Sequence, residues 1–280
     1  MQWYRCRDCG TSFQSVRRPE QKQQALFHDY VWGRQSLAQL AEKEGRSTKW
    51  IKQELDRAGR APAQLTPSST IIAVDTTFWG RHYGVTVFRS PILKKNLWCA
   101  EVESETPSIY ARGYRELTEK GWNITGAVID GRRGVAKVFS GIPVQICQFH
   151  QVKTVTTYLT RKPKTIAGQE LRAISLRLTR CTEKEFTKYL TDWHERWKDF
   201  LNERTPCSCC KEKRWPYTHR KLRAAYRSLI TNLPYLFTYQ KYPELNMPNT
   251  TNCLDGMFSQ LKNRLAVHRG LRRDRRYKLI

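Results

Sequence analysis

The stretch AVIDGRRGVAKVFSGIPVQICQFH, from Ala127 to His150, decides the expected fold. It begins with a short apolar run that ends in Asp130, and Gly131-Arg132-Arg133-Gly134 follows at once. A second apolar run, Val144-Gln145-Ile146, opens into Cys147-Gln148-Phe149-His150. Ligands of α/β sheets bind outside the carboxyl ends of the strands, so two strand ends with polar side chains predict a ligand site. Taken alone, Asp130 is equally well explained as a helix N-cap.

An earlier stretch repeats this pattern, because the apolar run Ile71–Val74 ends in Asp75. The residues predict strands over 70–77, 83–88 and 96–102, a helix over 107–120, the strand ending at Asp130, a short helix over 135–139 and the strand ending at Cys147. The order β-β-β-α-β-α-β, with acids on the first and fourth strands, is typical of an α/β fold of the ribonuclease H-like type. In that layout the two strands are neighbours, so we expect Asp75 and Asp130 to face each other.

Two facing carboxylates repel each other, and a shared Mg²⁺ (or Mn²⁺) ion holds both of them ionised. A pair of such ions can activate a nucleophilic oxygen and stabilise the leaving oxygen in phosphodiester chemistry. A third acid is then needed, and Asp255 lies near the start of a helix predicted within NTTNCLDGMFSQLK, Asn249–Lys262. The helix dipole also favours an acid at this position, so the spacing alone leaves the role of Asp255 open.

The composition points to an acidic partner. The 280 residues include 50 Lys and Arg against 25 Asp and Glu, a formal net charge of +25, and nucleic acid is the commonest partner of so basic a chain. We expect no membrane partner, because no apolar run approaches the roughly 20 residues that cross a bilayer and no secretory signal opens the chain. The clustered cysteines suit a reducing cytosol, with roles in metal binding or packing.

The N-terminal segment resembles half of a zinc ribbon. Cys6 and Cys9 form a CxxC pair followed by a glycine, and two thiolates at this spacing can meet one Zn²⁺ ion. No second cysteine pair lies within the expected ~15–20 residues. The missing second pair has three possible explanations: a longer N-terminus, a vestigial knuckle, or completion of the site by the distant Cys207, Cys209 and Cys210.

The pattern from 19 to 60 is helical and predicts a helix-turn-helix. A helix over 20–32 and a second one with Leu37, Leu40 and Ala41 on one face precede a turn at Gly45 and a third helix over 48–58, capped by Ser47. We expect this third helix to read the DNA major groove, with Lys49, Lys52 and Arg57 outward. A small packing unit with a solvated basic face is the alternative.

Four segments together resemble a known family: AVDTT (Ala73–Thr77), VIDGRRG (Val128–Gly134), CQFH (Cys147–His150) and the segment at Asn249–Lys262. They look like the motifs of the DDE transposases of the Mutator superfamily, in particular their bacterial insertion-sequence members. The resemblance covers roughly 70–270 and implies a ribonuclease H-like core with a large all-helical insertion.

This resemblance implies a role for each matching residue. Asp75, Asp130 and Asp255 would be the metal-binding catalytic acids, although the family usually has glutamate at the third position, and Cys147 and His150 would be its C-x-x-H pair. We expect His150 to donate a hydrogen bond to a carboxylate or to the scissile phosphate, and Cys147 to pack beneath it as a small hydrophobe. Double-stranded DNA would be the partner, bound by a homodimer in the cytoplasm of a prokaryote, at the nucleoid.

The segment from 154 to 248 is expected to be almost continuous helix. Trp193 either stacks on a DNA base, as an insertion-domain aromatic does in related transposases, or packs inside a helical bundle. Cys207, Cys209 and Cys210 with His219 could hold a structural zinc ion, although adjacent cysteines rarely both bind one ion. Beside Asp130, Arg132 and Arg133 are expected to contact DNA, and the basic run over 269–276 suits phosphate contacts.

The expected domains are a partial zinc knuckle over 1–18, the helix-turn-helix over 19–60, a linker over 61–69, the first part of the core over 70–153, the insertion over 154–248, and a final core helix with a basic tail over 249–280. Three functions fit them. The first is a transposase that cuts transposon ends and joins the 3′-hydroxyl to target DNA. The second is a decayed or domesticated transposase that only binds DNA. The third is a ribonuclease H-like nuclease, for which Glu101 or Glu103 would be an extra ligand.

Overall fold

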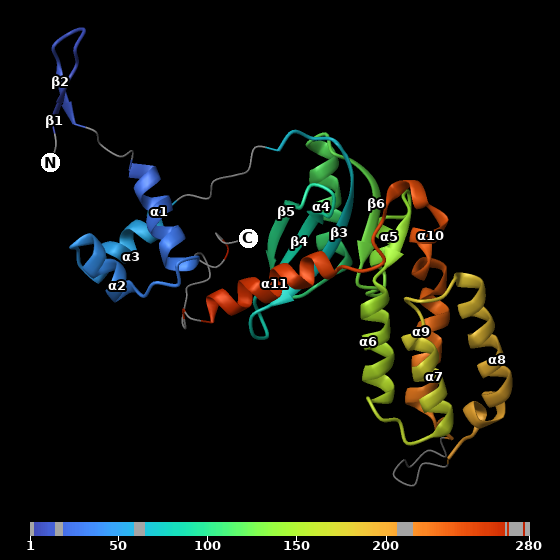
Figure 1. Ribbon diagram of the computed structural model, residues 1–280. Coiled ribbons are helices and arrows are strands. Elements are labelled where there is room, and N and C mark those ends of the chain that lie inside the picture. The colour runs from blue at the N-terminus through green and yellow to red at the C-terminus, as the bar shows by residue number, and fades with distance from the viewer. Residues whose placement is uncertain are drawn as a thin grey trace. The chain divides into compact units, whose positions relative to one another are not determined.

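The computed structural model describes residues 3–14, 19–58, 65–205, 215–266, 268 and 277. The chain divides into two compact units, and Figure 1 labels the elements of both. One unit comprises Met1–Leu65 with Met257–Ile280, and the other comprises Thr66–Gly256.

The larger unit is built on a mixed five-stranded sheet (Figure 1). Its strands are β3 (Ser69–Phe78), β4 (Gly84–Ser90), β5 (Lys95–Val102), β6 (Asn123–Ile129) and β7 (Val144–Ile146), in the order β5-β4-β3-β6-β7. Strands β3, β6 and β7 run parallel, whereas β4 is antiparallel to both β3 and β5. The predicted α/β class and the predicted pairing of the first and fourth strands of this sheet are therefore confirmed.

The core of this unit follows from the apolar runs. Strands β3 and β6 are buried along most of their length, as expected for parallel strands covered on both faces. Helix α4 (Pro107–Glu119) packs against β5 and approaches closely at Gly113, where a Cβ atom would lie 2.8 Å from the ring of Phe88. Helix α5 (Val135–Val138) packs against α4 and follows the turn after Asp130.

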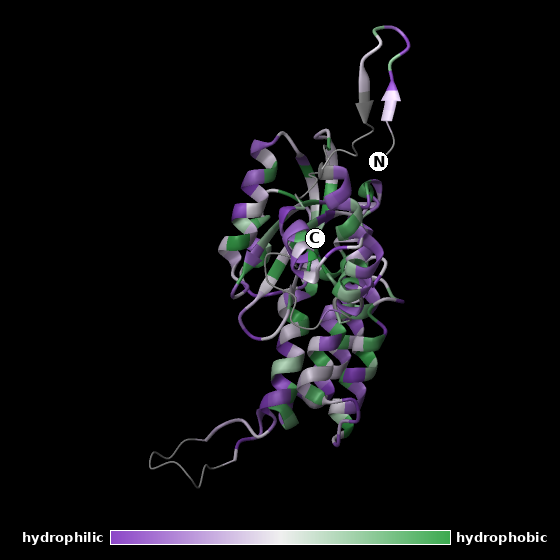
Figure 2. Cartoon of the chain, turned by 90° about the vertical axis from the view of Figure 1, so that its left-hand side faces the viewer, coloured by the Kyte–Doolittle hydropathy of each residue, from purple (hydrophilic) through white to green (hydrophobic). Residues whose placement is uncertain are grey.

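A bundle of helices follows β7. The helices are α6 (Gln148–Leu159), α7 (Ile166–Leu176), α8 (Glu183–Asn202), α9 (Arg220–Leu236), α10 (Thr238–Lys241) and the 3₁₀ helix η1 (Pro243–Leu245). Polar and apolar residues alternate around the long helices (Figure 2), and the apolar ones are buried between neighbours. Helices fill most of the described residues of this segment, and the first of them begins at Gln148, before the expected boundary at 154.

Side-chain amides fix the bundle to the sheet. Gln145 on β7 donates to the carbonyl of Leu236 and accepts from the backbone N–H of Tyr239, and Gln148 donates to the same Leu236 carbonyl. The hydroxyl of Thr238 donates to the carbonyl of Val144. These buried bonds hold the end of α9 against β7, so the helix that carries His150 and the last strand of the sheet form one framework.

The smaller unit contains the hairpin β1 (Trp3–Arg5) and β2 (Ser12–Gln14) and the helices α1 (Pro19–Val31), α2 (Leu37–Glu44) and α3 (Thr48–Arg57). The sequence explains the boundaries of α2 and α3. Ser36 and Gln39 form a reciprocal capping box, Gly45 ends α2 at φ 60°, and the hydroxyl of Ser47 accepts from the backbone N–H of Trp50. The predicted turn and cap are confirmed, and Leu40, Ile51 and Leu55 are fully buried.

Helix α11 (Asn252–Leu265) begins in the larger unit, with Asp255 in its first turn. Within the described part of the chain, no helix has the length and apolar character needed to cross a membrane. The basic run over 269–276 lies outside the described residues.

Candidate metal centre

Strand register brings the predicted residues to one edge of the sheet. Ala73 on β3 pairs with Val128 on β6, so Asp75 and Asp130 each lie two residues beyond a paired position. On the other side Ile129 pairs with Ile146, and the backbone N–H of Cys147 donates to the Ile129 carbonyl. Strand β3 continues to Phe78 because it stays paired with β4, so Asp75 lies within that strand, at the point where its pairing with β6 ends.

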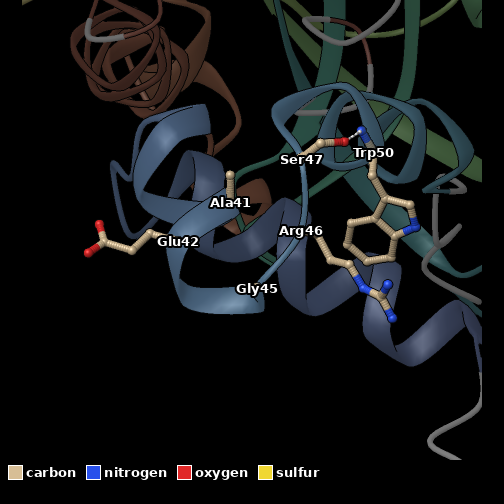
Figure 3. Close-up of a pocket in the computed structure, with 6 residues that line it drawn as sticks. All are labelled: Ala41, Glu42, Gly45, Arg46, Ser47 and Trp50. Carbon is tan, nitrogen blue, oxygen red and sulfur yellow. Dashed lines mark hydrogen bonds between the residues drawn. The ribbon is translucent and has the colours of Figure 1, made fainter.

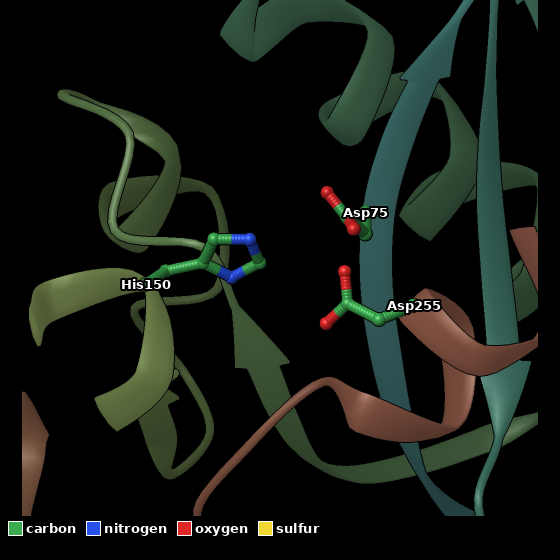
Figure 4. Close-up of side chains that lie close together, drawn as sticks. All are labelled: Asp75, His150 and Asp255. Carbon is green, nitrogen blue, oxygen red and sulfur yellow. The ribbon is translucent and has the colours of Figure 1, made fainter. Parts of the chain in front are cut away.

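Three side chains from distant parts of the sequence meet at this edge. One potential ligand atom from each of Asp75, His150 and Asp255 lies within 4.8 Å of the others. In Figure 4, His150 extends from the start of α6 toward the two carboxylates, which come from β3 and α11. Cys147 lies at a strand end, as expected, because it directly follows β7 and is the N-cap of α6, and His150 lies in the first turn of that helix.

Thr251 also joins these groups, and it lies within the Asn249–Lys262 motif, in which only Asp255 was expected to act at the site. Its backbone N–H donates to Sγ of Cys147 (3.3 Å), and its hydroxyl lies 3.3 Å from Nδ1 of His150 and 3.5 Å from a carboxylate oxygen of Asp255. Nearby, Asn249 and Gln148 exchange two hydrogen bonds of 2.9 Å. The segment that precedes α11 is therefore pinned to the start of α6, which places Asp255 opposite His150.

Burial changes the acidity of Asp75, whose residue is only 8% exposed. The pKa of its carboxyl is raised from 3.8 to about 7, and loss of solvation is the largest cause. The charges of Asp130 and Asp255 act in the same direction, while the charge of His150 and the backbone N–H of Thr76 oppose the increase. Because three acids act on one another here, a cation is the group best suited to stabilise all three in ionised form.

His150 is cationic at neutral pH in this arrangement. The pKa of the imidazole is raised from 6.5 to about 9, and a hydrogen bond with Cys147 is the largest cause. The charges of Asp75 and Asp255 act in the same direction, while burial opposes the shift. Burial would raise the pKa of the Cys147 thiol, but hydrogen bonds with His150 and Thr251 lower it overall. The expected burial of Cys147 is confirmed. The position of His150 would allow it to bind a metal ion. A protonated imidazole has no free nitrogen lone pair, however, so the raised pKa favours His150 as a hydrogen-bond donor.

Asp130 lies beside this cluster and contacts a second set of residues. A carboxylate oxygen of Asp130 accepts from the backbone N–H of Arg132 at 2.9 Å, and the guanidinium of Arg132 lies 2.7 Å from the carboxylate of Glu105. Glu105 also accepts from the hydroxyl of the buried Tyr110. Burial and the charge of Asp130 both raise the pKa of Glu105.

Glu105 is thus the acid after β5 that lies next to the site, and the sequence interpretation missed it. Glu101, one of the two proposed extra ligands, accepts a hydrogen bond from the hydroxyl of Tyr83, and Glu103, the other, is exposed. The three acids are spaced two residues apart, from the end of β5 to the start of α4, and this spacing was the available signal. Glu105 differs from the other two acids in its ion pair with Arg132, which lies in the turn after Asp130.

The residues of the centre could together hold a metal ion. Asp75 and Asp255 supply carboxylate oxygens, the ligands that Mg²⁺ and Mn²⁺ prefer, and Asp130 lies close enough to act on Asp75 electrostatically.

The prediction that Trp193 stacks on DNA is wrong. Trp193 is 2% exposed, and its indole N–H donates to the carbonyl of Ala167 at 3.0 Å. It lies at helical spacing after Phe186 and Leu190, which are also buried. The alternative, a tryptophan packed inside the helical bundle, therefore holds.

The cysteine clusters remain incomplete as metal sites. Cys6 and Cys9 lie in the turn of the N-terminal hairpin, and hydrogen bonds with Thr11 lower the pKa of Cys9 to about 7. Among the described residues, no third cysteine, histidine or acid joins this pair. Cys207, Cys209 and Cys210 lie outside the described residues, and the imidazole of His219 is 2.9 Å from the carboxylate of Glu203.

The third helix of the smaller unit exposes the predicted basic side chains. Lys49, Lys52 and Arg57 are exposed, although Arg57 also pairs with the buried Glu54 at 2.7 Å. Figure 3 shows a pocket at the turn that precedes this helix, where Arg46 lies over the ring of Trp50. Lys22 lies 5.3 Å from the centre of the same ring, so the N-terminal end of α3 is strongly basic.

Comparison with known proteins gives no relative from which to transfer a function. The sequence matches no protein-family model, and a search of curated proteins found no match.

Proposed function

We propose that this chain is a metal-dependent DNA transposase with a ribonuclease H-like core, which binds transposon ends, cleaves DNA and joins the 3′-hydroxyl to target DNA. The observation that carries the proposal is the meeting of Asp75, His150 and Asp255 within 4.8 Å, next to Asp130. The sheet order β5-β4-β3-β6-β7 supports a ribonuclease H-like core, because it places the first and fourth strands side by side. The motif resemblance to Mutator-superfamily transposases supports the assignment of the reaction.

Each residue has a part in the proposed chemistry. Asp75, Asp130 and Asp255 would hold the divalent cations, which would supply Lewis-acid stabilisation to the attacking and leaving oxygens of the phosphodiester. His150, protonated at neutral pH, donates a hydrogen bond to a non-bridging oxygen of the scissile phosphate. Thr251 orients the imidazole through its hydroxyl, and Cys147 packs beneath it.

The cleavage step releases a 3′-hydroxyl from the transposon end. Water supplies the attacking oxygen, the bond between phosphorus and the 3′-oxygen breaks, and the leaving oxygen takes a proton. In the joining step this 3′-hydroxyl attacks a target phosphodiester and displaces another 3′-oxygen. Both steps use one arrangement of acids, because each exchanges one oxygen of a phosphodiester for another.

DNA binding is assigned to the smaller unit and to the edge of the centre. Lys49, Lys52 and Arg57 on α3 would contact phosphates and the major groove, with the capped turn at Ser47 fixing the start of the reading helix. Arg132 and Arg133 are exposed beside Asp130 and would contact the strand that is cut. The net charge of +25 supports a DNA partner, which we expect a homodimer to bind.

A cleavage and joining assay tests the proposal. Full-length protein is incubated with Mg²⁺ or Mn²⁺ and labelled duplexes made from the DNA that flanks the gene, together with a supercoiled target plasmid. We expect cleavage at a defined end and covalent transfer of the label to the plasmid. Cleavage without joining would instead indicate a ribonuclease H-like nuclease, and binding without either reaction would indicate a DNA-binding protein that has lost its chemistry.

A further inference from the structure

A partly buried network of contacts leads from Asp75 on β3 toward the turn that follows Asp130. The backbone N–H of Thr76 donates to the carboxylate of Asp75, and the hydroxyl of Thr76 is 3.5 Å from that of Tyr110. Tyr110 donates to Glu105, and Glu105 pairs with Arg132 at 2.7 Å. The network thus passes from β3 through the segment between β5 and α4 to the turn that follows β6.

Two contacts lie at the turn after Asp130: a Cβ atom at Gly131 would lie 2.9 Å from the side chain of Ile146, and Arg132 forms an ion pair with Glu105. Gly131 and Gly134 have φ angles of 87° and 85°, which gives a tight turn that side chains other than glycine rarely adopt. Within it, the backbone N–H of Arg132 donates to Asp130, and the N–H of Val135 donates to the Arg132 carbonyl. Asp130 lies beyond the last paired residue of β6, so the pairing of strands does not hold its carboxylate in place.

We infer that Glu105 is a positioning residue, which holds the turn at 130–134 through Arg132 and so keeps the carboxylate of Asp130 facing Asp75. The side chain of Glu105 is only 8% exposed, whereas that of Arg132 is 45% exposed. The buried carboxylate of Glu105 is held in place by Tyr110, so the partly exposed guanidinium that pairs with it loses conformational freedom. A Cβ atom at Gly134 would lie 3.3 Å from Pro107, so the turn also lies close to the segment that carries Glu105.

This inference deepens the proposed function, because it rests on Asp130 as a catalytic acid. It also gives Arg132 a role other than DNA contact. One nitrogen of its guanidinium donates to Glu105, and the remaining N–H groups are still available as donors. Loss of Glu105 should therefore affect the turnover of bound DNA rather than DNA affinity.

The test measures amide hydrogen exchange of the full chain together with cleavage kinetics. In Glu105→Ala we expect exchange over 130–134 to accelerate by at least about tenfold, while the strands of the sheet keep their protection. We expect kcat for cleavage to fall about 10- to 100-fold at nearly constant KM. Glu105→Gln keeps one oxygen, which can accept from Arg132, while its NH₂ group can donate to the hydroxyl of Tyr110. It should therefore recover most of the protection and most of kcat.

Two further variants sharpen the result. Arg132→Ala should accelerate exchange over the same turn, and the double variant Glu105→Ala/Arg132→Ala should be no worse than either alone, because both break one contact. The matched control is Glu119→Ala, an exposed acid at the end of α4, which should leave exchange and kcat unchanged.

The outcomes separate this inference from the proposed function. Normal exchange over 130–134 in Glu105→Ala would overturn the positioning role, and so would a Glu105→Gln variant as impaired as Glu105→Ala, since that result would mark Glu105 as a direct metal ligand. If wild-type protein cleaves no DNA but Glu105→Ala still loosens the turn selectively, the positioning role stands and the proposed reaction fails.

Discussion

The candidate metal centre depends on contacts between residues far apart in the sequence, whereas the three-helix unit depends on local contacts. The centre is assembled over long distances, since Thr251 and His150 are 101 positions apart and still share a hydrogen bond. Helices α1, α2 and α3 lie within one continuous segment, and local caps at Ser36 and Ser47 define where α2 and α3 begin. Chemistry and DNA reading should therefore fail independently when either region is changed.

The largest effect is expected from Asp75→Asn. Asparagine keeps the size of the side chain but removes a charge that binds the cation, so cleavage should fall by several orders of magnitude while DNA binding is retained. The measurement is the cleavage rate under single-turnover conditions, with DNA affinity measured in parallel. Asp192→Asn, at an exposed acid on α8, is the control. Near-normal cleavage by Asp75→Asn would end the assignment of this residue.

The pH dependence of metal affinity separates a ligand from a donor at His150. The pKa of Asp75 is about 7, so below pH 7 most molecules carry a protonated Asp75 that the cation must deprotonate. Mn²⁺ affinity measured by calorimetry should rise with pH up to about 7, approaching tenfold per pH unit on the acid side, and then level off. Asp130, Asp255 and His150 are the charged groups that act on Asp75. A rise that continues to pH 9, near the pKa of His150, would mean that the imidazole binds the metal.

Thr251→Val should have a smaller effect on the centre. It removes the hydroxyl between His150 and Asp255 at a fully buried position and should cost about 1–3 kcal/mol of unfolding free energy. We expect a roughly 10-fold loss of cleavage, because the imidazole loses its orientation. Thr251→Ser keeps the hydroxyl and should retain most of the activity. Equal rates for the valine and serine variants would show that the hydroxyl has no role in cleavage.

The smallest effect, on binding alone, is expected from the three-helix unit. Replacing both Lys49 and Lys52 by alanine should lower the slope of log affinity against log salt by about two, since each phosphate contact contributes about 0.9. Lys43→Ala is a matched control, because Lys43 on α2 pairs with Asp29 at 2.7 Å. Its replacement should leave the salt dependence unchanged. An unchanged slope for the double variant would favour a packing unit with a solvated basic face.

The sequence predicted the parts of the fold that depend on local pattern. Apolar runs marked β3 and β6, and their acids lie at the expected edge because parallel neighbours bring their carboxyl ends together. Asp255 could not be chosen from spacing, because a helix dipole explains an acid in the first turn equally well. Thr251 and Glu105 were missed because their partners are set by tertiary contacts. Trp193 was misassigned, although its helical spacing from Phe186 and Leu190 already favoured burial.

A metal titration tests the central claim most directly. Mn²⁺ is added to the full-length protein at pH 8, without DNA, and binding is followed by calorimetry in the wild type, Asp75→Asn and Asp255→Asn. If Asp75 and Asp255 hold the cation together, the wild type should bind Mn²⁺ and each variant should lose at least about tenfold in affinity while its fold is retained. Equal binding by all three proteins would contradict the account.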